Sequence, residues 1–159
     1  MTRLTRFLAL PLEDRRVLVV SFALLCAVRL SLWIVPFRWL RFAVRRIASP
    51  PQGAPAPTPG EADRTVQAIE SAARSVPGAT CLTRALAAEI LLRRAGHPAA
   101  IRVGVSKTSS GELEAHAWIE AYGRVLLGDH DLDHYTRLER VADDLVDADP
   151  MSPGPPTGA

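Results

Sequence analysis

The chain has 159 residues, of which 48% are hydrophobic, and this composition suits one domain with a packed core. The formal net charge is only +2, and the nine arginines among residues 1–50 are interleaved with apolar residues and not clustered. The sequence also contains no nucleic-acid-binding motif, so this class of function is not favoured. The two cysteines, Cys26 and Cys81, do not form the pattern of a disulfide framework, and a reducing cytoplasm is the expected location.

Residues 1–48 are predicted to form an amino-terminal helical segment. The apolar run VLVVSFALLCAV, Val17 to Val28, covers about 18 Å as a helix, against roughly 30 Å of hydrocarbon in a bilayer. Extending the run to Phe37 places Arg29 inside the span, which is costly. We therefore expect a helix packed on protein, and peripheral association with a membrane stays an alternative.

A second helix is expected from FRWLRFAVRRI, residues 37–47, because aromatic residues alternate there with arginines. Its basic side faces solvent, a membrane surface or a partner. The side chains of the first helix expected to pack against the core or a partner protein are Leu18, Phe22, Leu25 and Trp33.

The segment SPPQGAPAPTPG, residues 49–60, contains five prolines and no apolar period, which predicts a stiff, extended linker. The core domain is assigned to residues 61–149. It starts with a helix whose apolar stripe is Ala62, Val66, Ile69, Ala73 and Val76. A short acidic helix is expected after Leu138, and residues 150–159 are expected to be a disordered tail.

Cys81 stands at the start of the next predicted helix. Thr80 is a plausible N-cap, residues 82–95 are rich in helix formers, and Gly96 fits the position that follows a helix. The free N–H groups of a helix start favour a thiolate, which makes a cysteine there a better nucleophile. The alternative is that Cys81 is a small buried apolar residue.

Three strands follow, at residues 99–107, 112–122 and 124–129, with a tight turn at Tyr122 and Gly123. A two-residue turn places His116 opposite Asp129, whereas a shift of one residue would bring His130 opposite His116. A helix-start cysteine, a histidine and a facing aspartate are the nucleophile, base and orienting group of a cysteine protease.

Two segments, CLTRALAAEILLRRAGHPAAIRVGVSK and EAHAWIEAYGRVLLGD, resemble the leader peptidases of lasso-peptide biosynthesis, a transglutaminase-like branch of the papain-like cysteine proteases. The resemblance implies an α+β fold, with a catalytic helix packed on a small antiparallel sheet, and a triad of Cys81, His116 and Asp129. It implies a hydrolase that cuts the leader from a ribosomally made precursor and frees the amino terminus of the core peptide, a step in antibiotic biosynthesis.

The resemblance also implies partners. No winged-helix recognition domain is evident, so we expect the peptidase half of a split system, in which a separate leader-binding protein delivers the precursor and an ATP-dependent cyclase closes the macrolactam. No cofactor is evident, no phosphate-binding loop is present, and the sequence leaves an ATP requirement of the peptidase step open.

Several alternatives stay open. A transglutaminase or amidase would use the same triad on another acyl donor, and a non-catalytic relative would use the fold as a docking module. The segment DHDLDH, residues 129–134, is more often a solvated turn than a metal site, so no metal is assigned. Trp118 and Glu114, on the strand face of His116, are the candidate substrate contacts, although Trp118 would equally shield the imidazole.

Overall fold

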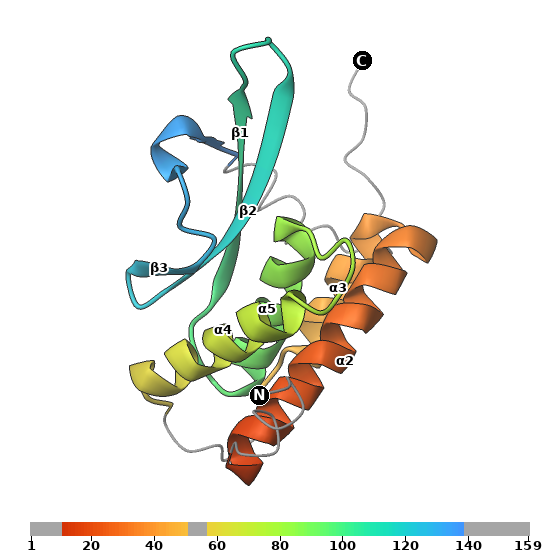
Figure 1. Ribbon diagram of the computed structural model, residues 1–159, viewed down its shortest axis with the longest axis vertical. Helices are drawn as coiled ribbons and strands as arrows, with labels where there is room; N and C mark the ends of the chain where they lie inside the picture. Colours follow the sequence, from red (N-terminus) through yellow and green to blue (C-terminus); the bar gives the residue numbers. More distant parts are fainter. Residues whose placement is uncertain (1–10, 51–56, 139–159) are drawn as a thin grey trace, which may run out of the picture.

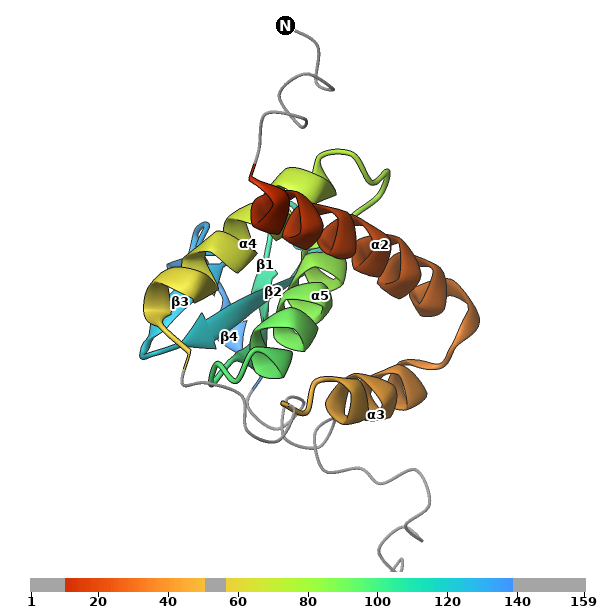
Figure 2. The same ribbon diagram turned by 90° about the horizontal axis from the view of Figure 1, so that it is seen from below.

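The computed structural model describes residues 11–50 and 57–138. An antiparallel sheet of order β3-β2-β1-β4 forms one side of the molecule (Figure 1). Helices α4 (Pro59–Ala73) and α5 (Cys81–Arg94) pack next to it. Figure 2 shows α2 (Leu12–Ile34) and α3 (Phe37–Ile47) on the side of α5 that lies away from the sheet. The predicted α+β class is confirmed.

Helix α2 is longer than the apolar run that predicted it. Glu13 and Asp14 lie in its first turn, where carboxylates complement the helix dipole, and Pro36 separates it from α3. Its fully buried residues lie on one face at helical spacing: Ser21, Leu25 and Val28. By length and composition α2 could cross a membrane, and only 17% of its most apolar window is buried in the protein.

Helix α4 begins inside the segment predicted to be a linker. Thr58 caps it, Pro59 takes the first helical position, and Glu61 accepts a hydrogen bond from the Thr58 backbone N–H at 2.8 Å, which completes a capping box. The prediction of an extended linker over residues 49–60 is therefore wrong at its carboxyl-terminal end, where α4 begins. Residues 51–56 lie outside the described part of the chain, as do the acidic helix predicted after Leu138 and the predicted tail.

The predicted ends of α5 are confirmed. Thr80 accepts a hydrogen bond from the backbone N–H of Thr83 at 3.3 Å, so it is the N-cap. Gly96 follows the helix with φ of +86°, the left-handed conformation that glycine adopts most readily. The chain then enters β1 (Ala100–Lys107) and turns back into β2 (Leu113–Ala121), which pairs with it in antiparallel register.

The predicted turn between β2 and β3 (Arg124–Leu127) is also confirmed. Tyr122 and Gly123 have φ of 54° and 71°, the pair of positive values that a type I′ hairpin turn requires. Two cross-strand pairs follow it in the predicted register: Ala121 with Arg124, and Glu120 with Val125.

A β-bulge then shifts the register of this hairpin. Ile119 faces Leu127, and this is the last described pair of β2 and β3. The pairing therefore does not reach His116, which lies three residues further along β2 from the turn. On its other side His116 faces Gly104 of β1. The predicted cross-strand pair of His116 with Asp129 is therefore wrong, because the bulge adds a residue that an alternating sequence pattern does not reveal.

The amino-terminal helices share one hydrophobic core with the helices and strands that follow. Leu25 and Val28 of α2 belong to the same cluster of buried side chains as Ile69, Leu86 and Ile119. Helix α3 adds Leu40 and Val44 to that cluster. The described part of the amino-terminal segment is thus built into the domain and is not a separate appendage.

Candidate active site

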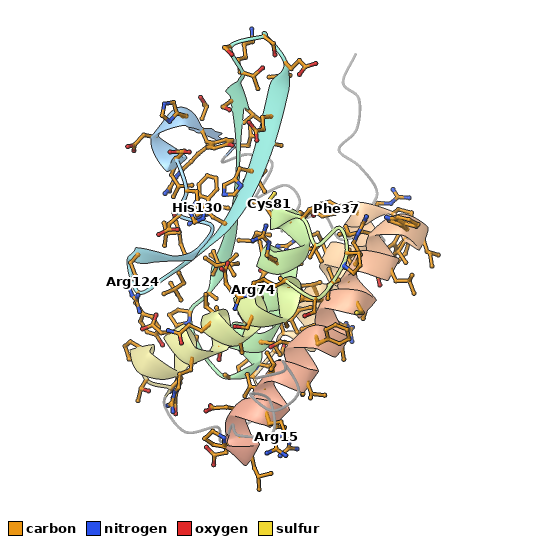
Figure 3. All side chains as sticks on the ribbon, viewed as in Figure 1. Arg15, Phe37, Arg74, Cys81, Arg124 and His130 are labelled. Atoms are coloured by element: carbon orange, nitrogen blue, oxygen red, sulfur yellow. The ribbon has the colours of Figure 1, made fainter. Side chains whose placement is uncertain are left out.

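Cys81 is the first residue of α5, and its thiol lies against strand β2. Its Sγ is 4.0 Å from the backbone carbonyl oxygen of Ala115, the residue that precedes His116. Helix α5 packs against β2, and this contact brings the helix start to the strand. Figure 3 labels Cys81 at the beginning of α5. The thiol is half-buried, so a substrate can reach it from one side.

His116 is half-buried on β2, and its ring orientation is fixed by a backbone carbonyl. Its Nε2 lies 2.9 Å from the carbonyl oxygen of Gly128. Because a carbonyl oxygen only accepts hydrogen bonds, Nε2 carries the hydrogen, and Nδ1 keeps the lone pair of the neutral ring. Nδ1 is therefore the atom of His116 that can take a proton from a thiol.

Two aromatic rings flank the imidazole of His116. The ring of Trp118 is stacked on it at 6.1 Å between centroids, and the ring of Tyr135 is tilted against it at 5.2 Å. Gly104, across from His116 on β1, makes this packing possible, because a Cβ there would lie 3.0 Å from both Trp118 and Tyr135. The aromatic pair therefore restricts the positions open to the imidazole.

Trp118 is itself held by Glu120 on the same strand face. The indole Nε1 donates to Glu120 Oε1 at 3.1 Å, and Arg102 Nε donates to Glu120 Oε2 at 3.1 Å. Arg137 of β4 (Thr136–Arg137) forms a further ion pair with this carboxylate and lies over the Trp118 ring. Burial alone would raise the pKa of Glu120, but these hydrogen bonds and arginine charges outweigh it and lower the pKa.

Asp129 does not contact His116 in this structure. Its carboxylate Oδ1 lies 2.9 Å from His130 Nδ1, and its side chain is 72% exposed. The Gly128 carbonyl oxygen accepts the hydrogen bond from His116 Nε2 that an orienting carboxylate was expected to accept. Gly128 has φ of +80°, and an added Cβ would lie 3.2 Å from His116 Nε2, so any other residue here would be strained and would crowd the imidazole.

Tyr135 belongs to the surroundings of Cys81 as well as to those of His116. Burial raises the pKa of the Tyr135 hydroxyl, and the negative charges of Glu114 and of a Cys81 thiolate add to this rise. Tyr135 therefore stays a neutral phenol at physiological pH. Glu114 is exposed near this hydroxyl, which suits the predicted substrate contact of that residue.

Trp118 is only 1% exposed, so its ring offers a substrate no surface in this structure and instead supports His116 from the inside. A groove with a volume of about 570 Å³ lies between α2 and α4. Asp14, Glu61 and Gln67 are among its lining residues, whereas neither Cys81 nor His116 lines it. Within the described ranges, no three His, Cys, Asp or Glu side chains form a group that could hold a metal ion.

A family model described as the Transglutaminase-like superfamily matches residues 24–140, and the chain belongs to this superfamily. The superfamily includes cysteine peptidases and acyltransferases. No curated protein and no solved structure matches the chain.

The sequence pattern singles out Cys81, His116 and Trp118, but it does not indicate the other residues that surround His116. Tyr135 and Arg137 reach the site because the two-residue strand β4 pairs with β1, a contact between distant segments that no local pattern indicates. Gly104 and Gly128 were available as signals, because a glycine inside a strand or directly after one often marks a close approach.

Proposed function

We propose that this protein is a cysteine peptidase that removes the leader from a lasso precursor peptide and frees the amino terminus of the core peptide. One observation carries the proposal: Cys81 at the start of α5 lies against the residue next to His116, and the hydrogen bond to Gly128 leaves Nδ1 of His116 as the base. Membership of the transglutaminase-like superfamily supports cysteine chemistry, and the resemblance of the two sequence segments supports the leader as substrate.

In the proposed reaction, His116 Nδ1 takes the proton of the Cys81 thiol. The thiolate attacks the carbonyl carbon that joins leader to core, and the backbone N–H of Cys81, which has no partner within the helix, donates to the developing oxyanion. His116 then gives its proton to the leaving amine of the core peptide. Water hydrolyses the remaining thioester and releases the leader, which restores the thiol.

Asp129 is proposed as the third catalytic residue. The Gly128 carbonyl orients the ring of His116 but is neutral, whereas a carboxylate also stabilises the imidazolium that forms during the reaction. A direct bond from Asp129 to His116 requires that the carboxylate leave His130 and replace the Gly128 carbonyl. Gly128 is the residue at which the chain can turn for this exchange, because glycine crosses backbone conformations that other residues avoid.

We further propose that the reaction takes place in the cytoplasm and depends on delivery of the precursor. A separate leader-binding protein would hold the leader beside Cys81, and an ATP-dependent cyclase would use the freed core peptide. Tethering a substrate raises its effective concentration at a second site to about the millimolar range. We therefore expect the chain alone to cut its precursor slowly and the leader-binding protein to raise the rate by orders of magnitude.

The experiment is a cleavage assay with purified protein, precursor peptide and leader-binding protein, read by mass spectrometry. Cys81→Ala should abolish cleavage and leave the circular dichroism spectrum unchanged. Cys26→Ala is the matched control, because this second cysteine lies exposed on α2, and it should keep most of the activity. Loss of cleavage in Cys26→Ala together with an active Cys81→Ala would overturn the proposal.

Acyl transfer to an amine is the second candidate, favoured by the acyltransferases within the same superfamily. Both reactions pass through the same thioester on Cys81. They differ in the group that accepts the acyl group, which is water in a peptidase and an amine in an acyltransferase. Adding the primary amine cadaverine to the cleavage assay distinguishes the two. A peptidase releases the leader with a free carboxylate, whereas an acyltransferase releases mainly the leader amide of the added amine.

A further inference from the structure

Helices α2 and α3 both carry large apolar side chains that are exposed, and these side chains are called here the outer face. Six large side chains define it: Val19, Phe22, Leu30, Trp33, Trp39 and Phe42. Trp33 is 75% exposed and Leu30 is 61% exposed. The four on α2 share one face of the helix by their spacing, and large apolar side chains gathered on an exposed helix face mark a surface that another apolar body covers.

Helix α2 lies along the protein and does not stand clear of it. Leu25 and Val28 are buried on its inner side in the common core. Moving α2 into a bilayer would break these contacts with the rest of the protein. The guanidinium of Arg29 lies against Gly78, where an added Cβ would be 2.9 Å from Arg29 Nη2. The same guanidinium lies over the ring of Trp33, 5.0 Å from its centroid. One side of the helix is thus committed to protein and the other is apolar and open.

After Glu13 and Asp14 in the first turn of α2, the remaining charge on α2 and α3 is positive. Between Asp14 and Glu61 the sequence contains seven arginines and no acidic residue. Of these, Arg41 is buried in an ion pair with Glu89, whereas Arg38 and Arg46 are exposed on α3 beside the aromatic residues. Apolar and aromatic side chains bordered by arginine are the composition of helices that lie in the interface of an anionic membrane.

We propose that the outer face docks on the surface of an anionic lipid bilayer, with α2 lying in the plane of the interface. The aromatic and aliphatic side chains enter the boundary between headgroups and acyl chains, and the exposed arginines of α3 bind the acidic headgroups. Figures 1 and 2 show α2 and α3 on the side of α5 away from the sheet, so the strands that carry His116 stay in water. The protein would be a peripheral membrane protein.

Sedimentation of the full chain with vesicles tests the proposal, using phosphatidylcholine alone and phosphatidylcholine mixed with phosphatidylglycerol. We expect binding to the anionic vesicles, little binding to the neutral ones, and release at high salt. One arginine near such a surface is worth about fivefold in partition, so Arg38→Gln with Arg46→Gln should weaken binding about 30-fold. Trp33→Ser should weaken it as well.

Matched controls come from the other side of the molecule. Leu113→Ser removes an apolar side chain that is 74% exposed on β2, and Lys107→Gln removes an exposed cation at the end of β1, so neither should change vesicle binding. Three results would overturn the proposal: no binding to either vesicle, equal loss in the controls, or a dimer in light scattering that Trp33→Ser dissociates while vesicles are not bound. Resistance to alkaline carbonate in native membranes would also overturn it, in favour of a spanning helix.

Discussion

Replacing Gly104 by alanine tests whether the aromatic packing around His116 sets the activity. The added Cβ would lie 3.0 Å from two carbon atoms of the Trp118 ring and 3.0 Å from Cβ of Tyr135. Contacts this short force the neighbours to move, and overpacking of a filled site typically costs about 1–3 kcal/mol of the free energy of unfolding. We expect a loss in that range for Gly104→Ala.

The same substitution should lower turnover more than substrate binding. His116 stands between the two rings that the new Cβ displaces, so its imidazole moves with them. A misplacement of about 1 Å costs roughly 100-fold in rate, and a displacement of part of that distance predicts about tenfold. We therefore expect kcat to fall by about tenfold, while KM stays nearly unchanged because neither ring is a proposed anchor for the leader.

Gly60→Ala is the matched control, because nothing lies within 4 Å of a Cβ at that position in α4. It should leave turnover unchanged and raise stability by up to about 1 kcal/mol. Urea unfolding followed by circular dichroism measures stability, and precursor cleavage with the leader-binding protein measures kcat and KM. If Gly104→Ala loses stability as expected but keeps kcat within twofold, the aromatic rings do not position His116.

Three further predictions concern the buried ion pair, the third catalytic residue and the pH dependence of stability. Arg41→Met leaves the carboxylate of Glu89, which is 2% exposed, with Arg93 at 3.6 Å as its remaining ion-pair partner. Urea unfolding should then show a loss of about 3–5 kcal/mol in the free energy of unfolding, and the double variant with Glu89→Leu should recover most of it. A loss below about 1 kcal/mol in the single variant contradicts this. Asp129→Asn should lower single-turnover rates by at least tenfold and by up to about 10⁴-fold, whereas Asp131→Asn should change them little; equal effects, or a loss below threefold for Asp129→Asn, would leave the Gly128 carbonyl as the sole orienting group. Burial lowers the pKa of His97 in the folded protein, so the unfolded chain takes up the proton first as pH falls, and stability should decline from pH 7 to pH 5. His97→Gln should flatten that decline and exposed His130→Gln should not, so parallel curves for wild type and His97→Gln would refute the assignment.

What the sequence predicts well are the features that neighbouring residues determine. The start of α5 depends on Thr80 and Thr83, and its end depends on Gly96, all within one helical turn of the boundary. The turn at Tyr122 and Gly123 likewise needs only two positive φ values in adjacent residues. For this reason the local sequence correctly predicts Cys81 at a helix start.

What the sequence predicts poorly depends on contacts between distant segments. The bulge beside Ile119 follows from packing of the sheet, and it is the reason that Asp129 does not stand opposite His116. The role of the Gly128 carbonyl could not be inferred either, because a backbone atom leaves no signal in the residue pattern. On α2, Leu25 is buried and Leu18 packs against the core as expected. Phe22 and Trp33 are exposed, because only one side of a helix that is apolar all round packs on α4 and α5, so for them packing on a partner stays a prediction.

The central claim is that Cys81 forms a thioester with the leader, and trapping that thioester tests it most directly. The protein is mixed with precursor and leader-binding protein, quenched in acid within milliseconds to seconds, and digested for mass spectrometry. We expect an adduct with the mass of the leader acyl group on the peptide that contains Cys81, present in Cys26→Ala and absent in Cys81→Ala. Cleavage that continues in Cys81→Ala, or an adduct that carries the core peptide instead of the leader, would contradict it.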